Sequence, residues 1–292
     1  MELTTQKPKL ILTDLDGTLL RDDKTLSPAN RAALERAAGQ GAQVVLSTGR
    51  SYKSLSQELR DLPFLRYFIL VNGAKVYDLQ TDTVLYRAEV PMDVAQGLFQ
   101  MFEPLDACID CYQNDTGLMD RKYYDHLERY IDDPHALKMT QDCRTPLDHF
   151  REAVRAGGES VQKLQAFFHT PEARTEALRQ LGEAYPQLIL SSSLPGNLEI
   201  NAPGATKGDA LLALCRALGL APACAVAFGD GTNDMTMIRM AGIGVAMGNA
   251  VEALKTEADY VTVTNDEVLA VADLVAPSNQ EDGVAQVLSR WF

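Results

Sequence analysis

Short apolar runs occur near both ends of the chain, and each stops where polar residues begin. In the first part these runs are Lys9–Thr13, Gln43–Leu46 and Tyr67–Val71. A continuous apolar run of this length is typical of a strand buried on both faces of a sheet. Helix signals separate the strands, first from Ser27-Pro28 onward and again over 51–62.

The same alternation returns in the last third of the chain. A predicted helix at Lys207–Leu218 precedes predicted strands at Ala225–Phe228 and Ile243–Met247, and further helices are predicted at Asp266–Leu274 and Gly283–Trp291. Strands that alternate with helices predict an α/β fold with a doubly wound parallel sheet. Ligands of such sheets collect beyond the carboxyl ends of the strands, and the polar residues of this sequence fall at those ends.

Between these two parts the pattern changes to mixed helices and strands with few ligand-like residues. A chain of 292 residues is long for one compact core, so two domains are expected. We therefore predict a catalytic core formed by 1–82 and 199–292, with an inserted α+β module at 83–198.

Composition narrows the class of partner. The formal net charge of -13 disfavours nucleic acid, which is bound through clustered Lys and Arg, but it allows a small phosphorylated metabolite held through a cation. The start of the chain lacks the apolar segment of a signal peptide, and the most hydrophobic region, 210–228, is broken by Gly219 and Pro222. We expect no membrane partner and a cytoplasmic location. An odd number of cysteines, five, favours reduced thiols.

Two acids, Asp14 and Asp16, follow the first predicted strand. A tight turn at Gly17 can redirect the backbone here, and the two carboxylates are not expected to be an equivalent pair. One is suited to nucleophilic attack and metal ligation. The other is suited to acid or base work, with its backbone carbonyl turned to the metal. The alternative is that both acids only open a turn.

More acids follow the strand that ends at Phe228, in the run Gly229–Asp234. Taken alone, this run can equally be a helix N-terminus, where Thr232, Asn233 and Asp234 act as capping residues. Oxygen ligands from two strand ends suit a hard cation such as Mg²⁺, which takes a few carboxylates together with water and substrate phosphate.

Two further segments are candidates for holding phosphate. The Thr48 hydroxyl and the N–H groups around Gly49 can bind phosphate oxygens at a helix start, although the same segment can be a plain strand-to-helix turn. Lys207 begins a helix, where a cation is unfavourable unless an anion compensates it. The alternative for Lys207 is a solvated surface lysine.

Taken in order, these segments resemble the four motifs of the haloacid dehalogenase-like superfamily, and specifically its Cof-type sugar-phosphatase branch. The motifs are matched by Asp14-Leu15-Asp16-Gly17-Thr18, Thr48-Gly49-Arg50, Lys207-Gly208 and Gly229–Asp234. Asn72-Gly73-Ala74 and the long insertion between the second and third motifs also match that branch. The resemblance covers nearly the whole chain and implies a Rossmann-like core with an inserted cap that selects substrate.

The resemblance also implies roles for the matching residues. Asp14 is the expected nucleophile, and Asp16 the expected acid and base. The expected ligands of Mg²⁺ are Asp14, Asp16 through its carbonyl, Asp230, and Asp234 directly or through water. The expected phosphate-binding residues are Leu15 through its N–H, Thr48, Gly49, Lys207 and Asn233.

These residues predict hydrolysis of a small phosphate monoester, such as a sugar phosphate or a phosphorylated cofactor precursor, through an aspartyl phosphate on Asp14. Two alternatives stay open. A phosphosugar mutase would use the same site to return phosphate to a sugar, and a phospho-ligand sensor would keep the pocket without catalysis. An acid at position 16 favours turnover of the phosphoenzyme by water, and intact Asp14, Asp16, Lys207 and Asp230 argue against lost catalysis.

Overall fold

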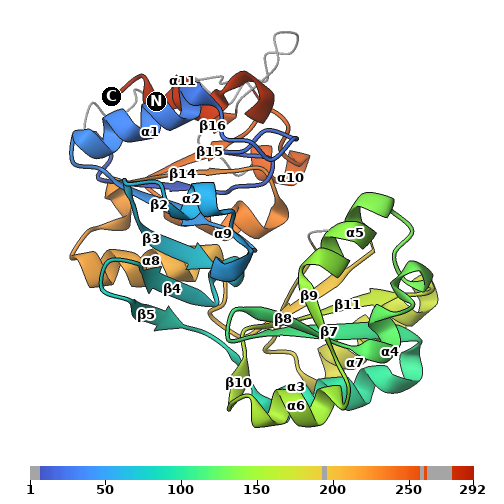
Figure 1. Ribbon diagram of the computed structural model, residues 1–292. Coiled ribbons are helices and arrows are strands. Elements are labelled where there is room, and N and C mark those ends of the chain that lie inside the picture. Colours follow the sequence, from blue (N-terminus) through green and yellow to red (C-terminus); the bar gives the residue numbers. More distant parts are fainter. Residues whose placement is uncertain (1–6, 193–195, 257–259, 262–277) are drawn as a thin grey trace. The chain divides into compact units, whose positions relative to one another are not determined.

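The computed structural model describes residues 7–192, 196–256, 260–261 and 278–292. The helix predicted at Asp266–Leu274 lies outside the described residues. The chain forms two compact units, the first comprising 1–50, 55–87 and 206–292 and the second 51–54 and 88–205. Figure 1 shows the elements of both.

Among its described residues, the first unit contains an eight-stranded sheet in the order β16-β15-β14-β1-β2-β3-β4-β5. All pairs from β16 to β3 are parallel, whereas β4 and β5 are antiparallel to their neighbours. The strands are β1 (Leu10–Thr13), β2 (Gln43–Ser47), β3 (Leu65–Leu70), β4 (Lys75–Asp78), β5 (Thr83–Arg87), β14 (Ala225–Gly229), β15 (Ile243–Ala246) and β16 (Tyr260–Val261). The predicted α/β fold with a parallel sheet is confirmed.

Helices cover both faces of this sheet, with α1 and α11 on one side and α8 and α9 on the other (Figure 1). The helices in the described part of the unit are α1 (Pro28–Gly39), α2 (Gln57–Arg60), α8 (Lys207–Leu218), α9 (Met235–Met240), α10 (Glu252–Lys255) and α11 (Gly283–Leu288). Leu10 and Leu12 of β1 pack in one core cluster with Leu211 and Leu214 of α8. Burial on both faces explains why the first strand is apolar at every position except Thr13, whose hydroxyl donates to the Asp14 carbonyl.

The helix predicted over 51–62 is shorter in the structure. It consists of a 3₁₀ turn at Tyr52–Ser54 and the single turn α2, whose N-cap Ser56 accepts a hydrogen bond from the Leu59 N–H at 3.4 Å. Pro63 cannot continue the hydrogen-bonding pattern and disfavours helical geometry in the residue before it, so the segment ends there.

The second unit contains a six-stranded sheet in the order β12-β13-β11-β7-β8-β9, antiparallel except between β8 and β9, and a short β10-β6 pair. Its strands are β6 (Val90–Pro91), β7 (Ala107–Gln113), β8 (Thr116–Asp120), β9 (Arg144–Leu147), β10 (Ser160–Val161), β11 (Lys163–Phe168), β12 (Ile189–Ser191) and β13 (Leu198–Asn201). Its helices are α3 (Met92–Phe102), α4 (Arg121–Tyr124), α5 (Pro134–Asp142), α6 (Phe150–Ala156) and α7 (Pro171–Ala184).

The boundaries of the two units differ by a few residues from those predicted at 83 and 198. Strand β5 pairs with β4 in the first unit's sheet, and β13 pairs with β11 and β12 in the second unit's sheet. A division of labour between a catalytic core and a substrate-selecting cap stays a prediction.

One side of the second unit's sheet carries buried charges. Arg144 Nε lies 3.0 Å from Asp110 Oδ2, and Lys163 Nζ lies 2.6 Å from Glu199 Oε1. Each of these side chains is less than a tenth exposed. The charges balance in pairs, as buried ions must to offset their loss of hydration.

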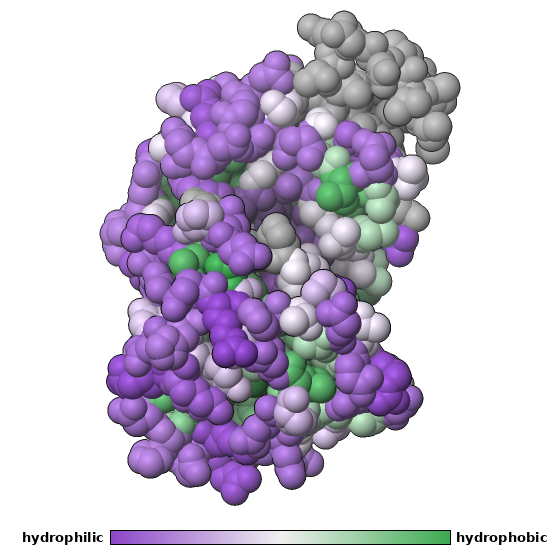
Figure 2. Space-filling model, turned by 90° about the vertical axis from the view of Figure 1, so that its right-hand side faces the viewer, coloured by the Kyte–Doolittle hydropathy of each residue, from purple (hydrophilic) through white to green (hydrophobic). Residues whose placement is uncertain are grey.

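The molecular surface is mainly polar on the face that Figure 2 shows, with hydrophobic residues in small separate patches. Among the described residues, the exposed large hydrophobic side chains are Met139, Leu190 and Val251. Within the same residues, every helix is too short or too polar to cross a membrane.

Candidate active site

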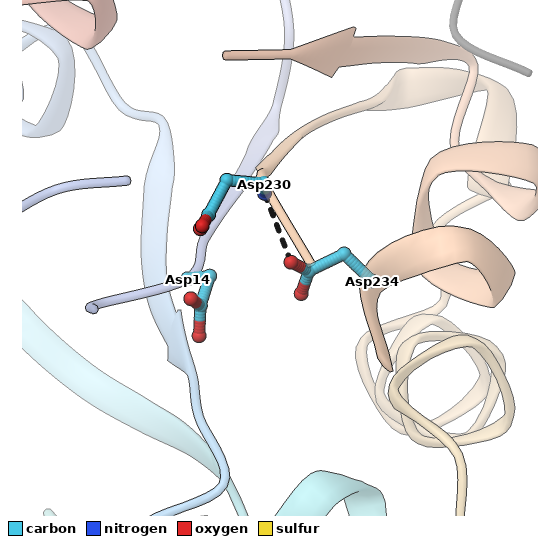
Figure 3. A group of neighbouring side chains, drawn as sticks. All are labelled: Asp14, Asp230 and Asp234. Carbon is cyan, nitrogen blue, oxygen red and sulfur yellow. Dashed lines mark hydrogen bonds between the residues drawn. The ribbon is translucent and has the colours of Figure 1, made fainter. Parts of the chain in front are cut away.

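Three carboxylates meet at the carboxyl edge of the first unit's sheet. Strands β1 and β14 are parallel neighbours, so the residues after them, Asp14 and Asp230, emerge at the same edge. The Asp14 N–H donates to the Phe228 carbonyl at 3.0 Å and thereby extends the ladder by one residue. One carboxylate oxygen from each of Asp14, Asp230 and Asp234 lies within 4.8 Å of the other two, and Figure 3 shows the three groups gathered around one point.

The loop after Asp14 is held against Asp230. Gly17 has a φ of +84°, and a Cβ atom there would lie 2.3 Å from Asp230 Oδ2, so only glycine lets the loop pass so close. The next residue, Thr18, donates its hydroxyl to Asp230 Oδ1 at 2.7 Å. This contact fixes the orientation of the Asp230 carboxylate. Thr18 belongs to the matched first motif, but its contact with Asp230 was not predicted.

Asp234 is oriented by the backbone of its own loop. Its Oδ2 accepts hydrogen bonds from the N–H of Asp230 at 3.0 Å, drawn dashed in Figure 3, and from the N–H of Gly231 at 2.9 Å. A Cβ on Gly229 would lie 2.4 Å from the Asp234 Cβ, so this glycine also makes room for the side chain. The helix N-terminus alternative is therefore partly correct, because Asp234 accepts hydrogen bonds from the N–H groups of two residues just before the helical turn.

Lys207 joins two of the acids. Its Nζ lies 2.7 Å from Asp14 Oδ1 and 2.5 Å from Asp234 Oδ1, and its side chain is fully buried. This burial excludes the alternative of a solvated surface lysine. Burial alone would lower the Lys207 pKa, but the charges of Asp14 and Asp234 outweigh it and raise the pKa above its ordinary value. The same two charges compensate a cation placed at the start of α8.

Burial and mutual repulsion disfavour ionisation of Asp14 and Asp230. Loss of hydration raises the Asp14 pKa to about 8, even though the Lys207 charge opposes the shift. Loss of hydration, followed by repulsion from Asp234, raises the Asp230 pKa to about 6. A cation bound beside these groups would reverse both effects by favouring the charged carboxylates.

Asp16 lies in different surroundings. Its carboxylate accepts two hydrogen bonds from Arg50, Nε to Oδ2 at 2.8 Å and Nη2 to Oδ1 at 2.7 Å, and one from Lys24 Nζ at 2.8 Å. Partial burial alone would raise the Asp16 pKa, but these bonds and charges hold it below its ordinary value. Lys24 was not predicted to belong to the site, and Arg50 was predicted only as the last residue of the second motif.

Three of the predicted phosphate-binding residues, Thr48, Gly49 and Asn233, lie against the turn that contains Asn72. The Asn72 N–H donates to the Thr48 carbonyl at 3.0 Å, and Asn233 Nδ2 donates to Asn72 Oδ1 at 3.1 Å. A Cβ on Gly49 would lie 2.9 Å from Asn72 Oδ1. Leu15 points its side chain into the core, which leaves its backbone to line the loop. Asn72 contacts the second and fourth motifs, although its own motif appeared in the sequence only as a family likeness.

The donor set fits a hard divalent cation. Asp14 Oδ2 and Asp230 Oδ2 accept no hydrogen bond from the described residues, whereas both oxygens of Asp234 are already engaged. Oxygen ligands alone suit Mg²⁺ rather than a soft metal. Asp14 and Asp230 therefore fit direct ligation best, and Asp234 fits a supporting position behind Lys207 and the Asp230 backbone.

Comparison with known proteins places the chain in a family. A family model for haloacid dehalogenase-like hydrolases matches residues 11–271. The chain is 30% identical over 291 residues to the 5-amino-6-(5-phospho-D-ribitylamino)uracil phosphatase YitU of Bacillus subtilis, covering 98% of both chains. It is 30% identical over 268 residues to the pyridoxal phosphate phosphatase YbhA of Escherichia coli, covering 88% of this chain and 94% of the relative.

Solved structures agree with the sequence comparison. A haloacid dehalogenase-like hydrolase from Bacteroides thetaiotaomicron superimposes with a TM-score of 0.78 at 28% identity, covering 98% of this chain and 100% of the other. One from Bacillus subtilis gives a TM-score of 0.78 at 28% identity, covering 97% and 100%. The resemblance carried by the four motifs is confirmed, and the chain belongs to the haloacid dehalogenase-like hydrolase family.

Proposed function

We propose that this chain is a Mg²⁺-dependent phosphatase that hydrolyses small phosphate monoesters through an aspartyl phosphate on Asp14. One observation carries the proposal. Asp14 is held by buried Lys207 through Oδ1, its Oδ2 accepts no hydrogen bond from the described residues, and its carboxylate lies beside those of Asp230 and Asp234. A carboxylate fixed at one oxygen and open at the other is oriented for attack.

The reaction has two balanced halves. Asp14 attacks phosphorus, the ester P–O bond breaks, and the leaving alkoxide takes a proton from Asp16. Water then attacks the phosphorus of the aspartyl phosphate, Asp16 accepts its proton, and Asp14 is released with inorganic phosphate. Bound Mg²⁺ supplies positive charge that offsets the charge of the phosphate oxygens.

Several residues hold the transferred phosphate in this proposal. Lys207 supplies a buried positive charge, and the Leu15 N–H, Thr48, Gly49 and Asn233 supply donors around the phosphate oxygens. Phosphoryl transfer depends mainly on such positioning and charge neutralisation. Asp16 meets Arg50 and Lys24 in this structure, so it has to exchange at least one of these bonds for a proton before it can act as the acid.

The proposed substrate is a small phosphorylated metabolite, either a sugar phosphate or a phosphorylated cofactor precursor. Two relatives named above support this class, because one is named for a phosphoribityl-amino uracil and the other for pyridoxal phosphate. The inserted unit is the proposed selector of the leaving group, since the phosphate-binding residues are all in the first unit.

The test is release of inorganic phosphate from 4-nitrophenyl phosphate and from a panel of phosphorylated metabolites. We expect activity that a chelator removes and Mg²⁺ restores, and none in Asp14→Asn. The exposed acid Asp23 provides a matched control, because Asp23→Asn lies outside the cluster and should keep wild-type turnover. Full turnover in Asp14→Asn would overturn the proposal. Isomerised sugar phosphate without free phosphate would identify a mutase, and tight binding without turnover would identify a sensor.

A further inference from the structure

Three consecutive residues adopt positive φ angles directly after β3. The angles are 51° at Val71, 57° at Asn72 and 103° at Gly73. Glycine adopts this region freely and asparagine tolerates it, but a β-branched residue such as valine is strained there. Strain of this kind persists only where the surroundings hold it, and it clusters at functional sites. The strained turn Val71–Gly73 is therefore a candidate for a functional role.

The backbone of the turn is held between two of the four motifs. The Val71 N–H donates to the Arg50 carbonyl at 3.0 Å, and the Asn72 N–H donates to the Thr48 carbonyl at 3.0 Å. On the other side, a Cβ on Gly73 would lie 2.1 Å from the Thr206 carbonyl oxygen, at the start of α8. The turn thus connects the Thr48–Arg50 segment to the helix that begins with Lys207.

The Asn72 side chain reaches the fourth motif, Gly229–Asp234. It is 4% exposed, and its Oδ1 accepts a hydrogen bond from Asn233 Nδ2 at 3.1 Å. The amide of Asn233 has two N–H donors, and this bond occupies one of them. Because an amide group is planar, fixing one N–H also fixes the direction of the second.

We propose that Asn72 is a positioning residue for the transferred phosphate. It orients the Asn233 amide so that the second N–H donates to a phosphate oxygen, and it holds the Thr48–Gly49 backbone at the same time. The left-handed turn is what brings the Asn72 side chain to Asn233. This inference rests on the proposed function only in assuming that phosphate binds among these residues.

The test measures the dissociation constant of inorganic phosphate by titration calorimetry in the presence of Mg²⁺. Asn72→Gly keeps a residue that accepts the positive φ and deletes only the side chain. We expect its dissociation constant to rise about tenfold, as for loss of one hydrogen bond to a charged group. Asn233→Ala, which leaves the turn untouched, should rise by a similar factor.

The double variant Asn72→Gly/Asn233→Ala separates positioning from general damage. If Asn72 acts through Asn233, the double variant binds phosphate about as well as Asn233→Ala alone. Effects that multiply, or an unchanged dissociation constant in Asn72→Gly, would overturn the inference. Asn114 is a matched control, because it also has a positive φ of 51° but lies in the second unit, and Asn114→Gly should bind phosphate normally.

Different results would contradict the positioning role of Asn72 and the phosphatase mechanism through Asp14. Phosphate binding is measured without turnover, so normal binding by Asn72→Gly in an active enzyme removes the positioning role and leaves the phosphatase proposal standing. Turnover that survives Asp14→Asn removes the proposed mechanism, whereas the binding comparison is still valid. Absence of phosphate binding by the wild-type chain would contradict the positioning role as well.

Discussion

Asp14 and Asp16 are separated by one residue and have different partners. Asp14 contacts Lys207 and faces Asp230, whereas Asp16 is held by Arg50 and Lys24. The turn at Gly17 was sufficient reason to expect two unlike carboxylates. The partners themselves could not be predicted, because Arg50 lies 34 residues from Asp16 in the sequence and nothing local pairs them.

At the residue scale, the first prediction concerns the buried cation of Lys207. Lys207→Met leaves Asp14 and Asp234 buried without their cation, so we expect loss of activity by more than about 100-fold and destabilisation by about 3–5 kcal/mol at pH 8. At pH 5 the destabilisation should shrink, because Asp14, whose pKa is raised to about 8, then carries a proton. Urea unfolding of the chelated protein at both pH values measures this.

Lys138 is the control for that measurement. It forms an exposed pair with Asp142 one helical turn away in α5. Lys138→Met should change the unfolding free energy by about 0.5 kcal/mol or less and leave activity unchanged. Equal effects of the two substitutions would mean that the buried contacts of Lys207 contribute no more to stability and activity than an exposed ion pair does.

At the scale of elements, the site depends on how closely loops approach each other at the sheet edge. Gly17→Ala adds a Cβ that would lie 2.3 Å from Asp230 Oδ2, so we expect activity to fall by about 100-fold or more as the Asp230 carboxylate is displaced. Gly41→Ala is the matched control, since Gly41 has a φ of +94° and open space around it. Steady-state kinetics and thermal melting of both variants separate the two contributions.

Both glycine variants carry the same backbone strain, so both should lose some stability. Only Gly17→Ala should lose activity beyond its loss of folded protein. A Gly17→Ala enzyme with the kcat of Gly41→Ala would show that the loop tolerates the extra atom and that its close approach to Asp230 is unimportant.

Elements were predictable where their pattern was local. The segments Leu10–Leu12 and Ala225–Phe228 are apolar throughout because β1 and β14 are buried on both faces, and both strands were predicted. The helix over 51–62 was overestimated because capping residues and a nearby proline limit it to short turns. The left-handed turn after β3 carried only an Asn-Gly pair as a signal, which does not say what the turn contacts.

At the scale of the whole molecule, the α/β fold and the presence of an insertion followed from the order of strands and helices. The buried pairs Asp110–Arg144 and Lys163–Glu199 did not, because each joins residues more than 30 positions apart whose neighbours are ordinary strand residues. Such long-range pairing is decided by sheet order, which a single sequence does not reveal.

The stability of the whole chain should depend on pH and Mg²⁺ together. The folded-state pKa values of about 8 for Asp14 and about 6 for Asp230 lie above the ordinary 3.8. The folded state therefore binds these protons more tightly than the unfolded state. Their contribution to stability is fully present below the ordinary value of 3.8 and is lost as pH rises from there through the folded-state values of about 6 and about 8. In chelated protein, Asp230→Asn should accordingly raise the melting temperature at pH 7.5 and raise it by less at pH 5.

Adding Mg²⁺ should reverse the order of stability of Asp230→Asn and the wild-type protein. Wild-type protein should gain about 2.7 kcal/mol at a Mg²⁺ concentration 100 times the dissociation constant, and Asp230→Asn should gain much less. Thermal melting with and without Mg²⁺ at the two pH values checks both statements. An Asp230→Asn variant that gains as much from Mg²⁺ as the wild type would exclude Asp230 from the metal site.

The central claim is that phosphate passes through the carboxylate of Asp14, and chemical trapping tests it most directly. Wild-type enzyme is quenched with acid during turnover of a phosphate ester and treated with borohydride, which reduces an acyl phosphate to an alcohol. Peptide mass spectrometry should then find homoserine at position 14, and none in a sample quenched without substrate. Homoserine at position 16 instead, or intact aspartate at position 14 under conditions of rapid turnover in which the phosphoenzyme accumulates, would contradict the account.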